Sequence, residues 1–525
     1  MYFNDLDELE DILDSIIPEH KTVFSEEETL DMTNNIMELL YDYIDANPTS
    51  IAEPDFQSTM VDIVRDQFDE QMDKCHLAYN YLEYLDAIDD LFEDALELFY
   101  EQIIPPRSFP DTFIRHVNTP KDVKRLQKQI DYLASKPQPD QRTPEWYVFR
   151  HGLITASNAY KAFESQSNQN YLIYEKCKPI NMESRSGFVN VDSPLHWGQK
   201  YEPISVMIYE KKYDTQVGDF GCIQHDKYKF IGASPDGINI DQNKPLRFGR
   251  MLEIKNIVNR EIDGIPKKEY WIQMQLQMET CELEECDFLE TRFKEYDDET
   301  QFLNDCDKDD NMDTQFLNTE NGDMKGIIMY FSSNEGKPHY VYKPLNMNKT
   351  EFEKWEEDTM DKLCGLDENG NQQYTWIKNI YWYLDEMSCV LVLRNHKWFQ
   401  DNISQLARIW NIIEKERVEG YEHRAPNKKP KKEELPTTNT IDKFFDLGDE
   451  HNQKILNEKQ TGCLLQIKKI DGDSLEDTIA DLKPPKPEPV QPPVIRIRTE
   501  SFDESKNTGV NLDALDEMIQ SINKN

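Results

Sequence analysis

Two carboxylates and one lysine are spaced in the chain so that they could bind a metal ion and act on a phosphodiester. Asp236 lies in "IGASPDGINI" (231–240), and Glu253 and Lys255 lie in "MLEIKN" (251–256). Side chains alternate along a strand, so Glu253 and Lys255 are expected on one face of it. The 16 residues between Asp236 and Glu253 are enough for a hairpin that brings the two acids together. Taken singly, an ordinary Pro-Asp-Gly turn would be the better explanation of Asp236. A solvated strand face with a cross-strand ion pair is the alternative for Glu253 and Lys255, but the amphipathic helix that follows should cover one face of that strand.

Two carboxylates near a backbone carbonyl form an oxygen-rich site of the kind that Mg²⁺ or Mn²⁺ prefers. Ile254, between Glu253 and Lys255, is the candidate for the carbonyl. A metal ion there would polarise a phosphodiester oxygen and lower the pKa of a bound water. Lys255 would orient or deprotonate that water and offset the developing negative charge.

Two predicted helices carry further polar candidates for this site. Glu202, in "HWGQKYEPISVMIYEKKY" (196–213), is a candidate third acid, although a surface helical position would explain it as well. In "YWIQMQLQM" (270–278), Tyr270, Gln273 and Gln277 share helical spacing, and Gln275 faces another way. Buried amides need partners, so Gln275 or Gln273 is predicted to position a water or a phosphate.

Charge is distributed unevenly over the 525 residues, whose net charge is −42. Residues 1–100 hold 28 acids and 3 bases, a net of −25, whereas residues 101–270 hold 21 acids and 25 bases, a net of +4. The segment with the acid–lysine motif is thus the one with a basic balance, which is compatible with a polyanionic substrate. The acidic helices of the N-terminal part could fold over this basic segment and weaken its non-specific binding of DNA.

The cysteine content and the N-terminal sequence indicate an intracellular protein. It is expected in the cytoplasm (at a viral replication site if the chain is viral) or in the nucleus. The nine cysteines are scattered without a CxxC pair, as is typical of reduced thiols. The acidic N-terminus lacks the layout of a signal peptide. The apolar runs are too short to span a membrane, so no membrane association is expected.

Four regions are predicted from periodicity and composition, and the fold class is α/β (α+β). Apolar residues at three- and four-residue steps predict an acidic all-helical domain over 1–104. A basic helix and linker follow over 105–141. Alternating helical and strand patterns over 142–420 predict the mixed domain, which contains an acidic low-complexity insertion at 296–325. Residues 421–525 are rich in Pro, Lys and Glu and are predicted to be a disordered tail.

Five sequence blocks occur in an order and spacing that resemble the YqaJ-type viral recombinase family of PD-(D/E)XK nucleases, which includes the phage lambda exonuclease. The blocks are "RTPEWYVFRHGLITASNAYKAF" (142–163), "WGQKYEPISVMIY" (197–209), "GASPDG" (232–237), "LEIKN" (252–256) and "YWIQMQLQM" (270–278). The resemblance implies a restriction-endonuclease-like fold, a mixed central sheet flanked by helices. It also implies a Mg²⁺-dependent deoxyribonuclease that degrades double-stranded DNA ends 5′→3′ and leaves a 3′ strand for a single-strand annealing protein.

The resemblance assigns roles to individual residues of this chain. Asp236, Glu253 and the Ile254 carbonyl would hold metal with help from Glu202, and Lys255 would be catalytic together with a glutamine such as Gln275. Arg150 and Ser157, in "RHGLITAS" (150–157), would hold the 5′ phosphate, with Tyr270 and Gln273 also on the DNA-binding side. A surface ion pair for Arg150 and a helix N-cap for Ser157 are the plain alternatives. The acidic N-terminal helices, the 296–325 insertion and the long tail are additions to the family pattern, and they leave the oligomeric state open.

The tail contains a short segment with the spacing of a groove-binding helical turn. In "TTNTIDKFFDL" (437–447), Ile441, Phe444 and Phe445 stand at i, i+3 and i+4. The segment, with clamp-motif positions 438–445, resembles the sliding-clamp (PCNA) binding motif, but Thr438 occupies the position of the usual Gln. An incidental apolar patch is the alternative.

Two other functions remain open on the sequence alone. One is an endonuclease of the same superfamily, because one site could serve both reactions. The other is a non-catalytic interaction protein with a nuclease fold, whose acidic arms bind basic partners or mimic DNA. The presence of all four charged site residues favours catalysis in recombination, repair or viral genome processing.

Overall fold

Three helices occupy the N-terminal part of the chain in the computed structural model. The residues that the structure describes are 24–74, 81–115, 117–180, 190–191, 193–306, 312–365 and 372–426. Helices α2 (Glu26–Ala46), α3 (Phe56–Lys74) and α4 (Tyr81–Gln102) pack on one another, and the short helix η1 (Ser50–Ala52) joins the first two. Ser25 and Glu28 form a capping box that satisfies the first amides of α2. The predicted helical character of this part is confirmed for the described residues.

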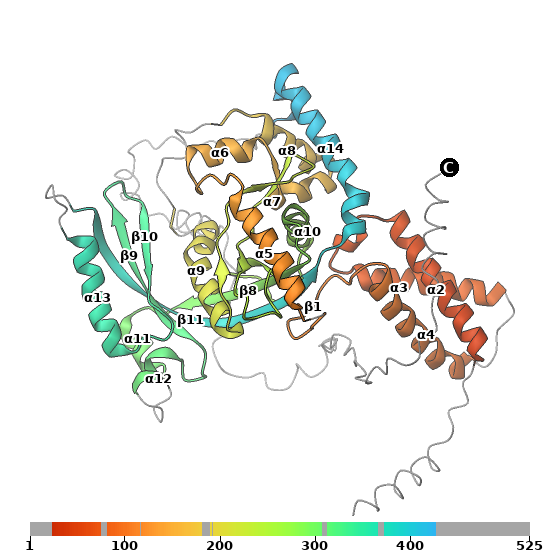
Figure 1. Ribbon diagram of the computed structural model, residues 1–525, viewed down its shortest axis with the longest axis horizontal. Helices are drawn as coiled ribbons and strands as arrows, with labels where there is room; N and C mark the ends of the chain where they lie inside the picture. The colour runs from red at the N-terminus through yellow and green to blue at the C-terminus, as the bar shows by residue number, and fades with distance from the viewer. Residues whose placement is uncertain are drawn as a thin grey trace, which may run out of the picture. The chain divides into compact units, whose positions relative to one another are not determined.

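The central element is a mixed sheet with the order β10-β9-β11-β8-β7-β6-β3, and β1 pairs separately with β11 (Figure 1). Its strands are β1 (Phe109–Pro110), β3 (Val217–Gly218), β6 (Gly237–Asn239), β7 (Met251–Asn256), β8 (Glu285–Glu295), β9 (Lys325–Ser333), β10 (Pro338–Tyr342) and β11 (Tyr374–Leu393). Strands β7 and β8 are parallel, and the other pairs are antiparallel. A smaller sheet has the order β2-β5-β4, formed by Ile154–Thr155, Ile231–Ala233 and Ile223–Gln224.

Two helices cover opposite faces of β7 and β8. Helix α9 (Pro194–Tyr213) places Tyr209 against Leu252, Ile254 and Leu289 on one face. Helix α10 (Lys268–Cys281) lies over the other face, toward which Glu253 and Lys255 point. A strand with polar residues on one side and apolar residues on the other is therefore buried on both sides. The predicted mixed sheet flanked by helices is confirmed.

The long strand β11 connects this core to an extension of the sheet. Its second half pairs with β8, and its first half pairs with β9. Helices α11 (Glu299–Asn304) and α13 (Lys349–Cys364) contact β11, and α12 (Met312–Leu317) contacts β9 (Figure 1). The predicted acidic insertion carries Phe302 and Phe316, which pack with Phe352 of α13 in a small hydrophobic cluster. The described part of the insertion is thus anchored by apolar residues despite its acidic composition.

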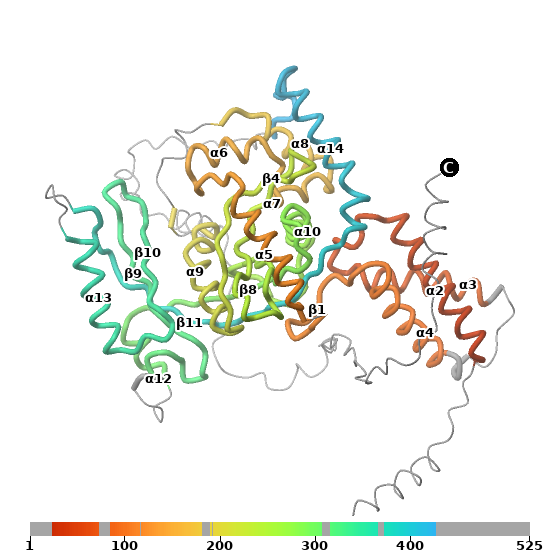
Figure 2. Tube along the Cα trace, viewed as in Figure 1, coloured from red at the N-terminus to blue at the C-terminus, as the bar shows by residue number. Residues whose placement is uncertain are grey.

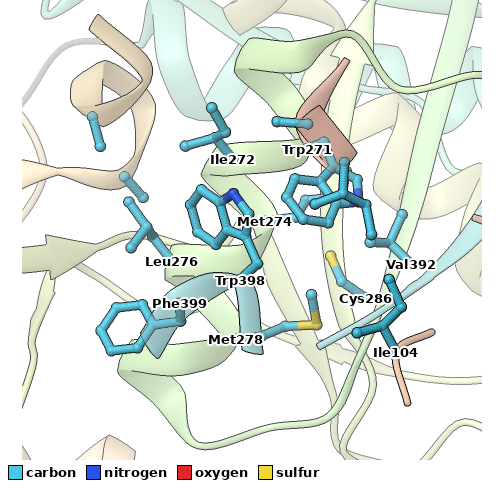
Figure 3. Packing of buried hydrophobic residues seen from close by; sticks show 14 of the residues in the cluster. Ile104, Trp271, Ile272, Met274, Leu276, Met278, Cys286, Val392, Trp398 and Phe399 are labelled. Carbon is cyan, nitrogen blue, oxygen red and sulfur yellow. The ribbon is translucent and has the colours of Figure 1, made fainter. Parts of the chain in front are cut away.

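The remaining helices are α5 (Pro120–Ser135), α6 (Pro144–His151), α7 (Ala156–Ala159), η2 (Tyr160–Phe163), α8 (Gln166–Cys177), α14 (His396–Glu419) and η4 (Glu422–Arg424) (Figure 2). Of these, α7, η2 and α14 pack on α10, and α8 packs on α14. Trp398 of α14 meets Trp271 of α10 edge to face, with ring centroids 5.3 Å apart (Figure 3). The described residues form one compact unit by their contacts. Within them, no helix has the length and apolar character needed to cross a membrane.

Candidate active site

Asp236 lies directly opposite Glu253 because of the register between two strands. Strand β6 pairs with β7 through Gly237 opposite Leu252, and one further antiparallel step brings Asp236 to Glu253. The Asp236 N–H donates to the Leu252 carbonyl at 3.1 Å, which continues the ladder to this residue. Asp236 Oδ2 accepts a hydrogen bond from the Ile254 N–H at 2.7 Å. The predicted hairpin is therefore present, and the two carboxylates stand at the same edge of β7.

The carbonyl of Ile254 faces the same edge as the Asp236 carboxylate. The N–H and C=O of one strand residue point toward the same neighbouring strand, and the Ile254 N–H points toward Asp236. Strand β6 pairs with β7 only up to Leu252, so Ile254 lies beyond the ladder. Two carboxylates and one carbonyl thus converge there as the sequence predicted.

Glu253 is completely buried, and its carboxylate accepts three hydrogen bonds. Oε1 accepts from Gln273 Nε2 at 2.7 Å and forms an ion pair with Lys255. Oε2 accepts from Gln277 Nε2, also at 2.7 Å. Hydrogen bonds to an ionised group are stronger than those between neutral groups, so these donors fix the orientation of the carboxylate.

Gln273 and Gln277 reach Glu253 together because residues four apart lie on one face of a helix. Gln277 also donates to the Ser234 carbonyl at 3.1 Å, and it therefore links the acid on β7 to the turn that carries Asp236. Its Oε1 is buried and has no hydrogen-bond partner among the residues that the structure describes.

Gln275 does not reach the site, and its predicted catalytic role is not supported. Its Nε2 donates to the Leu393 carbonyl at 3.0 Å, and its Oε1 accepts from the Asn395 N–H at 2.7 Å. Both ends of the amide therefore join α10 to the segment between β11 and α14. The amides that contact Glu253 are those of Gln273 and Gln277; the sequence placed Gln277 on the same helix face as Gln273 but did not assign it to the site.

Lys255 lies between the acid and an aromatic ring. Its Nζ is 4.9 Å from the centroid of the Tyr270 ring, and the guanidinium of Arg260 lies 5.7 Å from the same ring. Arg260 forms an ion pair with Glu290, which is buried and lies beside Lys255 in the register of β7 and β8. Tyr270, predicted to contact DNA, is thus a neighbour of both cations.

Burial and mutual repulsion alter the pKa values of the acidic groups. Burial, followed by the charge of Glu253, raises the pKa of Asp236 well above its usual range. The same two causes raise the pKa of Glu202. Burial alone would lower the pKa of Lys255, but the charges of Glu253 and Asp236 outweigh it and hold that pKa above its ordinary value. A cation between or beside these acids therefore stabilises their ionised forms.

Glu202 lies on α9 within electrostatic range of Glu253 and Lys255. Helix α9 is tied to the end of β7, because Asn256 donates to the Gly198 carbonyl at 2.8 Å and Ser205 donates to the Asn256 side chain at 2.7 Å. No group of three His, Cys, Asp or Glu residues stands at metal-binding distances in the described ranges. The structure accordingly brings two carboxylates together and places the third acid nearby.

Arg150 is connected to the turn before Asp236. Its Nη1 donates to Ser234 Oγ at 3.2 Å, and its guanidinium lies 4.5 Å from the Trp146 ring. Ser157 is exposed on α7, with its Oγ 3.4 Å from that of Thr155. Arg150 therefore contacts the turn that precedes Asp236, and Ser157 belongs to a short helix that packs on α10. Ile441, Phe444 and Phe445, the predicted clamp-binding residues, lie outside the described residues.

Comparisons with known proteins find similar sequences for part of the chain. Residues 145–284 match the sequence model of the YqaJ-like viral recombinase domain. An uncharacterised protein of Acanthamoeba polyphaga mimivirus is 30% identical over 316 residues, which are 55% of this chain and 55% of the relative. The chain thus matches about half of the length of that curated relative.

Two solved structures were also found. An alkaline exonuclease (LHK-Exo) from Laribacter hongkongensis is 17% identical, with a TM-score of 0.29 over 52% of this chain and 94% of the other. Its complex with dAMP is 18% identical, with a TM-score of 0.28 and the same coverage. Residues 145–284 contain Asp236, Glu253, Lys255 and Arg150, so the predicted resemblance to the YqaJ-type viral recombinase family is confirmed for this part of the chain.

Proposed function

We propose that the protein is a metal-dependent DNA nuclease that hydrolyses phosphodiesters 5′→3′ from double-stranded ends during recombination, repair or viral genome processing. The observation that carries the proposal is the fully buried Glu253, paired with Lys255 on one strand face and placed opposite Asp236. Glu253 is fully buried, and Asp236 and Lys255 are partly buried. Burying charged groups is costly unless they are paired, hydrogen-bonded or bound to a metal ion. The match of residues 145–284 to the recombinase domain supports the same function.

Mg²⁺ or Mn²⁺ fits the donor set at the edge of β7. Asp236, Glu253 and the Ile254 carbonyl offer hard oxygen ligands. Burial, followed by the charge of Glu253, raises the pKa of Asp236, and a divalent cation would offset both effects by stabilising the ionised form. Glu202 would add charge from α9. When bound, the ion would polarise a phosphate oxygen and lower the pKa of a water.

The residues of the chain orient the reacting groups. Gln273 and Gln277 hold the Glu253 carboxylate from α10, while the Lys255 ammonium offsets negative charge that develops on the phosphate. Arg150, held near the Asp236 turn by Ser234, would bind a terminal 5′ phosphate together with Ser157. Recognition of a terminal phosphate by these two residues would favour exonuclease action, since an internal phosphodiester lacks that group.

Two partners besides DNA follow as proposals from the sequence. A sliding clamp would bind the segment with Ile441, Phe444 and Phe445, and a single-strand annealing protein would take up the remaining 3′ strand. Clamp binding is tested with a tail peptide. Affinity that persists after all three residues are changed to Ala contradicts it.

The decisive experiment compares 5′-phosphorylated linear duplex with closed circular DNA, in Mg²⁺ and in EDTA, for wild type and Lys255→Ala. Mg²⁺-dependent loss of the linear DNA alone, absent from the variant, is the expected result. Cleavage of the circle would identify an endonuclease instead. DNA binding without cleavage of either substrate would favour the non-catalytic alternative.

A further inference from the structure

Helix α5 carries a stripe of unpaired positive charge on its outer face. Lys121, Lys124, Arg125 and Lys128 are exposed, and among the described residues none of the four makes an ion pair or a side-chain hydrogen bond. At about 100° per residue they lie within an arc of roughly 100°. We name these four residues the α5 stripe.

The α5 stripe lies roughly opposite the side of the helix that packs on the protein. Leu126, Ile130 and Leu133 are buried on that inner side, so the four cations point directly into solvent. The chain has 101 acidic residues that could have neutralised them. Four adjacent cations without a partner, in a chain of net charge −42, indicate that their partner is another molecule.

We propose that the α5 stripe binds the phosphate backbone of duplex DNA away from the cleavage point. Lys and Arg side chains supply most contacts to phosphates, whereas lysine is depleted in the centres of protein–protein interfaces. Seven residues of helix span about 10 Å, which matches roughly three phosphates along one strand. This inference rests on the proposed nuclease function only for the identity of the substrate.

Helix α5 is fixed to the two elements that form the site. Gln129 donates to the Cys281 carbonyl at the end of α10, at 2.7 Å. Asn118, before the helix, donates to the Pro245 and Phe248 carbonyls in the loop that leads into β7. Phe248 precedes Glu253 by five residues, so the stripe lies on the order of 20 Å from the acids. It would hold the duplex in register with the site without touching the reacting phosphate.

The continuous run of cations ends at Lys128. Asp131 is exposed on the next turn of α5. Beyond it, Lys136 and Lys229 share one acid, Asp226, at 2.9 and 3.8 Å. The charges toward the C-terminal end of α5 are therefore mixed, and the unpaired positive charge is concentrated in the α5 stripe.

The test compares two triple variants on different helices. The first is Lys121→Ala, Lys124→Ala and Lys128→Ala in the α5 stripe. The control is Lys349→Ala, Lys354→Ala and Lys362→Ala on α13, three exposed lysines that likewise make no ion pair among the described residues. Alanine keeps helix propensity in both, and thermal melts check that both variants fold as the wild type does.

Binding of a labelled 30-base-pair duplex is measured in Ca²⁺ between 50 and 200 mM KCl. Each lost phosphate contact reduces the slope of log K against log salt by about 0.9. The stripe variant should therefore lose up to about 2.7 from that slope, and bind at least about tenfold more weakly at 50 mM, while the control keeps the wild-type slope.

An unchanged slope in the stripe variant, or an equal loss in both variants, would overturn the inference. The first outcome would assign the stripe to an acidic protein or to solvent. Wild-type binding with the expected slope change, but without Mg²⁺-dependent hydrolysis, would reject the nuclease function and keep the DNA contact.

Discussion

Replacing Gln277 by methionine isolates the contact that links Glu253 to the turn before Asp236. The substitution keeps the size and burial of the side chain and removes one donor. Glu253 Oε2 then loses the donor at 2.7 Å, and the Ser234 carbonyl loses the one at 3.1 Å. Oε1 keeps its contacts with Gln273 and Lys255.

The energetic cost follows from these contacts. A hydrogen bond to a charged group contributes about 1.5–3 kcal/mol. The substitution also removes Gln277 Oε1, a buried acceptor without a partner among the described residues. Its removal stabilises the folded state by about 1 kcal/mol. The lost hydrogen bond to the Ser234 carbonyl adds about 0.5–1 kcal/mol, so the expected net loss is about 1–3 kcal/mol in unfolding free energy. If misplacement of the carboxylate raises the activation barrier by the same amount, kcat/KM falls about 5- to 150-fold.

Gln275→Met is the matched control, two residues away on the same helix. Gln275 is equally buried and uses both ends of its amide, on the Leu393 carbonyl and the Asn395 N–H. Its loss should lower stability at least as much as the loss at Gln277, without touching Glu253. Urea unfolding gives the stabilities, and cleavage of linear duplex is measured at a temperature where both variants stay folded.

Both variants should lose stability, so a comparison of the two distinguishes a loss of activity from a loss of stability. Only Gln277→Met should lower kcat/KM, and the loss should appear in kcat at saturating DNA. Equal losses in both variants, or full activity of Gln277→Met, would refute the positioning role derived from the geometry.

Three further changes test other parts of the site and its surroundings. Lys255→Met should lower single-turnover cleavage by about 10²–10³-fold, with DNA affinity in Ca²⁺ unchanged. Arg150→Gln should remove about 1.5–3 kcal/mol of phosphate binding, measured as a 10- to 100-fold loss of preference for 5′-phosphate over 5′-hydroxyl ends. Burial lowers the pKa of Lys176 to about 8, so the unfolded state holds the proton longer and wild-type stability should rise between pH 8 and about 10, by up to about 3 kcal/mol. Lys176→Met should abolish that rise in urea unfolding curves.

The central acids and lysine were predictable because short-range geometry determines their relation. Strand alternation placed Glu253 and Lys255 on one face, and a turn with a hairpin-length gap placed Asp236 opposite. Each of these rules spans a few residues. The position of Glu202 depends on how α9 packs across the sheet, which pairs residues about 50 positions apart, and no local pattern specifies such a distance.

A local pattern explains why Gln277 contacts Glu253 and the predicted Gln275 does not. At 100° per residue, Gln275 shares its helix face with Trp271, Met274 and Met278, which belong to the large hydrophobic cluster. Gln277 lies with Tyr270 and Gln273 on the face toward β7. The apolar neighbours of Gln275 were visible in the sequence, and they identify it as a core amide that needs backbone partners.

Removal of residues 1–104 would not test their effect on DNA binding. The Arg107 guanidinium donates to the Ile51 carbonyl at 2.8 Å and to the Pro266 carbonyl, and residues of α2, α3 and α4 belong to the same hydrophobic cluster as Trp271. Deletion would therefore expose the apolar surface around α10 and disturb the site itself.

Replacing exposed acids by neutral residues changes the charge of the N-terminal helices and leaves their packing unchanged. Asp62 and Asp66 are exposed on α3, and their replacement by Asn leaves the buried side of the helix unchanged. If the acidic helices repel DNA, the double variant should bind duplex more tightly at 20 mM salt, by about two- to fivefold. The gain should vanish at 200 mM, where charges more than about 8 Å apart are screened. A gain that persists at 200 mM would indicate direct contact, and no gain at either salt concentration would mean that the helices lie too far from the bound duplex to oppose it.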